Sequence, residues 1–230
     1  TTTSAYIFNP RLDPIGFFRM LFEELGVGEK CETKAEYLLA LNQYLIEKLA
    51  ANERVLLIVD EAQNLSAEML EEIRLLSNLE TPTSKLIQIM LVGQPELQEL
   101  VDQPELRQLR QRIALRHHLR PFDEGEVAEY VAGRLSKAGY TGRGIFKKDA
   151  VKALFRFTQG TPRLINNVCD GALLLGYARQ LKRVGVNEVR EVANDLGLVA
   201  GGESKKIDSQ RAKQKAPKRQ GRRRLLWFLH

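Results

Sequence analysis

The chain has 230 residues, 43% of them hydrophobic, which is enough for one large domain or two small ones. It contains 35 basic and 29 acidic side chains, but residues 204–224 hold ten Lys or Arg and one Asp, so this segment carries +9 and the remainder −3. The remainder therefore lacks a broad nucleic-acid-binding charge. The two cysteines, Cys31 and Cys169, exclude a disulfide framework and fit a reducing cytoplasm.

The first 60 residues predict an α/β unit. Residues 4–10 are typical of a strand entering a turn, and Asp13-Pro14 begins a helix that runs to about Leu25. A second helix, at residues 33–50, repeats the apolar spacing of the first, and a strand at residues 55–59 follows. The order strand, helices, strand indicates an α/β fold.

The strand at residues 55–59 ends in two carboxylates, Asp60 and Glu61. Five apolar residues without alternation predict a strand buried on both faces, as in a parallel sheet with helices on either side. The carboxyl end of such a strand faces the ligand crevice, where a cation is the obvious partner for buried carboxylates. The pattern is that of a Walker B motif, in which the Asp helps to hold Mg²⁺ and the Glu polarises water. Alternatively, it is a core strand that ends in helix-capping acids.

A second strand, at residues 86–92, ends at Gly93-Gln94-Pro95 after a helix that begins at Ser66. The Gln94 amide could orient water or phosphate, or it could be an ordinary turn residue before a helix. Residues 106–113 then bring three arginines within six positions, which by itself is also typical of a solvated helix face.

From residue 122 the periodicity is helical, after a short strand at residues 114–119. The helices are expected at 124–138, 148–158, 162–179 and 187–196, and they predict a compact bundle. The third helix begins Thr161-Pro162-Arg163, with Thr161 as its N-cap. Arg163 opposes the helix dipole, a penalty that a bound phosphate would remove, although a tolerated surface Arg is the alternative.

The chain closes with three arginines, Arg222 to Arg224, followed by an apolar run that contains Trp227. This pattern resembles the cytoplasmic flank of a membrane helix. The alternative is a frayed basic tail.

Four blocks, in this order, resemble one known family. They are V-D-E-A-Q-N-L at 59–65, L-V-G-Q-P-E-L at 91–97, L-R-Q-L-R-Q-R-I at 106–113 and G-T-P-R-L-I-N at 160–166. Together they resemble the AAA+ ATPases of the general secretion pathway protein A (ExeA-like) type over residues 1–197. The resemblance implies an α/β fold, a P-loop NTPase-type (AAA+) parallel sheet with flanking helices, followed by a smaller all-helical lid domain.

The resemblance also implies domain bounds and site residues. The α/β core would span 1–121, the lid 122–199, and a basic disordered tail 200–230 would lead into a possible membrane helix. Asp60 and Glu61 match Walker B, with Asp60 at Mg²⁺. Gln94 matches sensor 1, and Arg163 matches the nucleotide-binding arginine of sensor 2. The arginine finger would be Arg112 or, as the second choice, Arg110.

The implied cofactors are ATP and Mg²⁺, and the implied function is assembly of a type II secretion (secretin) complex. The implied partners are further copies in a ring or a second secretion-pathway subunit, together with the secretin assembly machinery. The location would be the cytoplasmic face of the bacterial inner membrane, where the tail would contact anionic lipid.

The family's Walker A loop, G-x-x-x-x-G-K-S/T, does not occur in these 230 residues. We therefore expect a fragment that lacks the first strand, P-loop and helix, and that hydrolyses no ATP as it stands. Two other classes remain open: a transposition-type AAA+ regulator that binds DNA, and a non-hydrolysing adaptor that has lost its P-loop.

Overall fold

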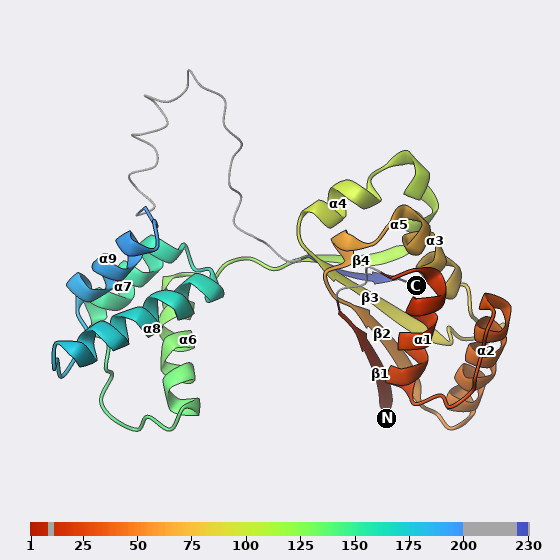
Figure 1. Ribbon diagram of the computed structural model, residues 1–230, viewed down its shortest axis with the longest axis horizontal. Coiled ribbons are helices and arrows are strands. Elements are labelled where there is room, and N and C mark those ends of the chain that lie inside the picture. The colour runs from red at the N-terminus through yellow and green to blue at the C-terminus, as the bar shows by residue number, and fades with distance from the viewer. Residues whose placement is uncertain (9–11, 200–224, 230) are drawn as a thin grey trace, which may run out of the picture. The chain divides into compact units, whose positions relative to one another are not determined.

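The computed structural model describes residues 1–8, 12–199 and 225–229, and it divides by internal contacts into two compact units (Figure 1). The first unit comprises residues 1–119 with 222–230, and the second comprises residues 120–221. Each unit is described by itself below.

A five-stranded sheet forms the centre of the first unit, in the order β1-β2-β3-β5-β4. The strands β1 (Thr2–Ile7), β2 (Arg54–Val59) and β3 (Ile87–Gly93) are mutually parallel, whereas β5 (Leu225–Leu229) runs antiparallel to β3 and to β4 (Ile113–His118). The predicted fold class, an α/β fold with a mostly parallel sheet and flanking helices, is confirmed.

The helices begin where capping residues place them. In α1 (Pro14–Leu25) the Asp13 carboxylate accepts the Gly16 N–H at 3.0 Å. In α2 (Lys34–Ala50) Thr33 and Glu36 form a reciprocal capping box. In α3 (Ala67–Leu76) the Ser66 hydroxyl accepts an N–H of the first turn. Short helices complete the unit: η1 (Ala62–Asn64), α4 (Glu96–Val101), η2 (Pro104–Leu106) and α5 (Arg107–Arg112).

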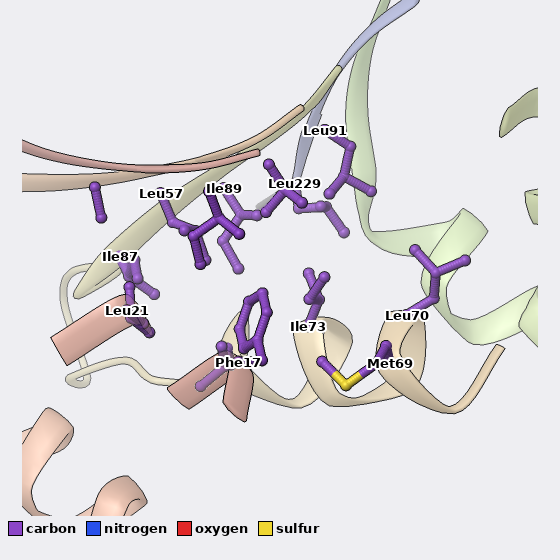
Figure 2. Packing of buried hydrophobic residues seen from close by; sticks show 14 of the residues in the cluster. Phe17, Leu21, Leu57, Met69, Leu70, Ile73, Ile87, Ile89, Leu91 and Leu229 are labelled. Carbon is purple, nitrogen blue, oxygen red and sulfur yellow. The ribbon is translucent and has the colours of Figure 1, made fainter. Parts of the chain in front are cut away.

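One face of the sheet packs on these helices. Figure 2 shows Leu57, Ile89 and Leu91 of the strands facing Phe17 of α1 and Ile73 of α3. The other face is less covered.

In β2, for example, Val55, Leu57 and Val59 are buried, but Leu56 and Ile58 are only half-buried. The prediction that this strand is buried on both faces is therefore wrong. The reason is that the helices of this unit place their buried side chains against a single face of the sheet.

The apolar C-terminal run forms the strand β5, and not the helix that the sequence pattern suggested for these residues. Residues 225–229 pair with β3 on one side and β4 on the other, so their main chain is satisfied within the sheet. Trp227 is 1% exposed and lies under the Arg116 guanidinium, 4.9 Å from the centre of the indole ring. No helix within the described ranges is long and apolar enough to span a membrane. The expectations for residues 200–224 and 230 lie outside the described residues.

The second unit is helical and has its own core. Its helices are α6 (Glu124–Lys137), α7 (Lys148–Thr158), α8 (Pro162–Ala178) and α9 (Val186–Asp195), within two residues of the predicted bounds. Buried side chains from all four pack together, among them Val127, Leu154, Ile165, Val168 and Val189.

The turn into α8 differs from the prediction in one respect. Thr161 occupies the N-cap position of α8, but its side chain makes no capping hydrogen bond. Gly160 instead fixes the turn. It has a φ of 73°, and a Cβ there would lie 1.8 Å from the Phe122 carbonyl oxygen. Only glycine fits this approach of two backbones.

Candidate functional site

The polar side chains of the first unit gather where β2 and β3 end. These strands are parallel neighbours, with Val59 opposite Leu91, so the residues that follow them emerge at one edge of the sheet. Asp60 and Glu61 follow β2, and Gln94 follows β3. The structure therefore brings together three of the six predicted site residues.

Asp60 is almost buried, with 7% of its surface exposed. Its Oδ1 accepts the Glu61 N–H at 2.8 Å, and its Oδ2 accepts the Tyr6 hydroxyl of β1 at 2.7 Å. A buried carboxylate needs such partners to offset the loss of water. Tyr6 is a site residue that the sequence analysis did not identify.

Glu61 adopts a left-handed backbone conformation, with φ 53° and ψ 37°. This conformation is uncommon for a residue other than glycine and is of order 1 kcal/mol less favourable than a regular one. It turns the chain from β2 into η1. The half-buried Glu61 side chain then faces Gln94, whose Nε2 donates to Glu61 Oε2 at 3.0 Å.

Gln63, in η1, joins these two residues and was also missed by the sequence analysis. Its Nε2 donates to Glu61 Oε2 at 2.7 Å, and its Oε1 accepts the Gln94 N–H at 3.0 Å. Gly93 allows this approach, because a Cβ at that position would lie 2.9 Å from Gln63 Oε1. The sequence signal was present in the D-E-A-Q block, but its partner lies 31 residues away.

The carboxylates at this edge of the sheet suit a magnesium ion that is coordinated mainly by water and by the phosphates of a bound substrate. Within the described parts of the chain, no group of three or more His, Cys, Asp and Glu could hold a metal ion. Mg²⁺ typically binds through one or two carboxylates, water and substrate phosphates, so it needs no such group. A carboxylate oxygen has more than one lone pair, so an oxygen that already accepts a hydrogen bond can also bind a cation.

The three predicted arginines belong to other elements, namely the helices α5 and α8. Arg112 is the last residue of α5 and is half-buried. Arg110, two residues earlier, donates from Nη1 to the Asp102 carbonyl at 3.4 Å. Arg163 is exposed in the first turn of α8, which belongs to the second unit.

Comparison with known proteins relates this chain to a family. Residues 1–101 match the AAA domain. General secretion pathway protein A of Aeromonas hydrophila is 43% identical over 200 residues, which are 86% of this chain and 35% of that protein. The chain therefore spans about a third of the length of this curated relative.

Solved structures agree on the fold. Cdc6p of Pyrobaculum aerophilum superposes with a TM-score of 0.65 at 16% identity, covering 85% of this chain and 53% of that one. The RuvB branch migration motor of Thermotoga maritima gives 0.52 at 16% identity, covering 91% and 68%. Identities this low support the fold alone. The sequence matches, by contrast, identify an AAA domain in residues 1–101 and relate the chain to general secretion pathway protein A.

Proposed function

We propose that this chain supplies the catalytic carboxylates and the helical lid of an ATP-hydrolysing AAA+ protein. The observation that supports this most is the hydrogen bond from Gln94 Nε2 to Glu61 Oε2, which joins the ends of two parallel strands. A carboxylate and an amide so placed can both contact one water molecule or one phosphate at the sheet edge.

In this proposal Asp60 and Glu61 have different roles. Asp60 would hold Mg²⁺, which when bound neutralises phosphate charge. Glu61 would orient the attacking water and accept its proton, and Gln94 would donate a hydrogen bond to the same reacting group. The phosphates also need a cradle of N–H groups and a lysine, and the chain contains no G-x-x-x-x-G-K-S/T sequence to supply one.

The second unit would act as the lid of the nucleotide site, with Arg163 contacting phosphate. The basic last turn of α5 supports Arg112 as an arginine finger, with Arg110 as the alternative. A finger that acts on a neighbouring subunit requires an oligomer, either a ring of this chain or one shared with a second secretion-pathway subunit. We propose residues 1–121 and 122–199 as the bounds of core and lid.

The name of the Aeromonas relative supports a role in secretion. We propose that ATP hydrolysis is coupled there to assembly of a type II secretion (secretin) complex on the cytoplasmic side of the inner membrane. The +9 charge of residues 204–224 would favour contact with anionic lipid.

A non-hydrolysing adaptor is the second candidate, and the sequence feature that bears on it is that residues 1–230 contain no Walker A pattern. A DNA-binding role gains no such support. Drosophila ORC bound to DNA is among the similar structures, but at 18% identity it is informative about the fold alone.

The test is ATP turnover by the full-length protein with Glu61→Gln. Removing a general base lowers turnover by about 10²–10⁴-fold, and ATP binding should be retained. Glu68→Gln, at an exposed position in the first turn of α3, is the matched control and should leave turnover unchanged. Wild-type turnover with Glu61→Gln contradicts the proposal, and a wild-type protein that binds no ATP supports the adaptor.

A further inference from the structure

In the V-D-E-A-Q-N-L block, the two carboxylates are not alone in the site. The side chain of Gln63 also hydrogen-bonds to site residues. It uses both ends of its amide. The NH₂ group donates to Glu61 Oε2 at 2.7 Å, while the carbonyl oxygen accepts the Gln94 backbone N–H at 3.0 Å. One side chain therefore links the end of β2 to the end of β3.

We propose that Gln63 is a positioning residue that fixes Glu61 and Gln94 relative to one another, and so sets where the carboxylate lies for water activation. The inference rests on the proposed ATP hydrolysis, which it deepens. Gln63 would act through Glu61 and Gln94 and would not itself contact the nucleotide.

Two features show that this link is specific to an amide of this length. Glu61 needs a donor, since an ionised carboxylate only accepts, and the Gln94 N–H needs an acceptor. Glutamine offers both in a single planar group. Gly93 also favours the contact, because a Cβ at that position would lie only 2.9 Å from Gln63 Oε1.

The same hydrogen bonds also help to hold the backbone of Glu61 in its left-handed conformation. A residue in this backbone conformation persists only when its surroundings hold it there. The Gln63 donor lies two residues along the chain and reaches back to the Glu61 carboxylate. Gln63 and Gln94 together hold the same oxygen, Oε2, from η1 and from the end of β3.

Two substitutions separate the two halves of the link. Gln63→Glu keeps the size and the acceptor for the Gln94 N–H, but replaces the donor by a carboxylate that repels Glu61. Gln63→Met keeps the approximate size and removes both donor and acceptor. The matched control is Gln43→Glu on α2, where Gln43 makes the same amide-to-carboxylate contact with Glu47 at 2.8 Å on an exposed surface.

The experiment has two readouts. The first is kcat and KM for ATP in the full-length protein. The second is hydrogen exchange of the Gln94 N–H, followed by NMR in the 230-residue chain without nucleotide. Gln63→Glu should lower kcat by at least tenfold with KM within twofold, and should leave the Gln94 N–H protected. Gln63→Met should lower kcat and also speed exchange of that N–H, while Gln43→Glu should change neither.

The results that overturn the proposal are distinct. A wild-type kcat with Gln63→Glu means that Gln63 does not position Glu61. Equal losses of kcat and of Gln94 protection in both Gln63 variants mean that Gln63 merely stabilises the fold. If the wild-type full-length protein hydrolyses no ATP, the proposed function fails, and faster exchange in Gln63→Met alone then still supports the link to Gln94.

Discussion

The candidate site of the first unit and the helix starts of the second differ in how far apart in sequence their polar partners lie. In the first unit Glu61 pairs with Gln94 across 33 residues, and Tyr6 pairs with Asp60 across 54. In the second unit the capping pair Asp123 and Glu126 lies three residues apart, and Glu188 caps Gly185 at the same spacing. A sheet edge therefore assembles distant residues into a site, whereas a helix start satisfies its polar groups within one turn. The bundle also contains long-range hydrogen bonds, such as the one from the Tyr130 hydroxyl to Asn166 Oδ1 at 3.1 Å.

The largest expected effect concerns which unit supplies a catalytic arginine. An arginine finger contributes about 10³–10⁵-fold in rate in GTPases, so Arg112→Ala should lower ATP turnover by at least 10³-fold in the full-length protein. Arg163→Ala, in the second unit, should mainly weaken ATP binding. ATP hydrolysis and nucleotide affinity measured on both variants check the assignment.

Mixing Arg112→Ala with Glu61→Gln tests whether the finger acts between subunits. Each variant lacks one half of a composite site, so activity should partly return in the mixture. Full activity of Arg112→Ala alone would transfer the role to Arg110. A mixture that stays inactive although both proteins assemble, as judged by sedimentation with ATP and Mg²⁺, would contradict a finger supplied in trans.

The next effect is on stability, and it tests whether the units unfold separately. Leu57 in the first core and Leu154 in the second are both fully buried. Truncating either to Ala should cost about 2–5 kcal/mol of unfolding free energy. Because each unit has its own core, Leu57→Ala should destabilise only the first unit and Leu154→Ala only the second.

Each unit provides its own probe for this measurement. Trp227 is the sole tryptophan and is buried in the first unit, so its fluorescence in urea follows that unit. Burial raises the pKa of the Cys169 thiol to about 12, so labelling of Cys169 follows opening of the second unit, in a Cys31→Ser background. Equal shifts of both probes in either variant would show one cooperative structure.

The smallest effect compares two helix starts within the second unit. The Asp123 carboxylate accepts the Glu126 N–H at 2.9 Å, whereas the Thr161 side chain makes no capping bond. Asp123→Ala should therefore cost about 0.5–2 kcal/mol, and Thr161→Ala close to nothing. Urea unfolding followed by Cys169 labelling measures both. A larger cost at Thr161 would contradict the geometry of that turn.

Local patterns in the sequence predicted most of the fold. Asp13, Thr33 and Ser66 cap the helices they were expected to begin, because capping depends on residues within one turn. Burial was harder to predict, since the apolar run at 55–59 does not reveal that Leu56 and Ile58 are only half-covered. The strand at 225–229 was missed because three arginines before an apolar run also fit a membrane flank.

The candidate site was predictable only in part. Asp60, Glu61 and Gln94 could be found, because each follows an apolar strand and the ends of parallel strands meet. Tyr6 and Gln63 were missed, since contacts that define their roles join them to residues 54 and 31 positions away. Arg110, Arg112 and Arg163 remain predictions.

The most direct test of the account is a Mg²⁺ titration of ATP binding, with turnover measured in the same samples, for full-length Asp60→Asn and Glu61→Gln. The account predicts a division of labour between the two carboxylates. Asp60→Asn should lose the Mg²⁺-dependent part of ATP binding. Glu61→Gln should bind Mg²⁺ and ATP as the wild type does, and turn over about 10²–10⁴-fold more slowly. Unchanged Mg²⁺ dependence in Asp60→Asn, or wild-type turnover in Glu61→Gln, would contradict it.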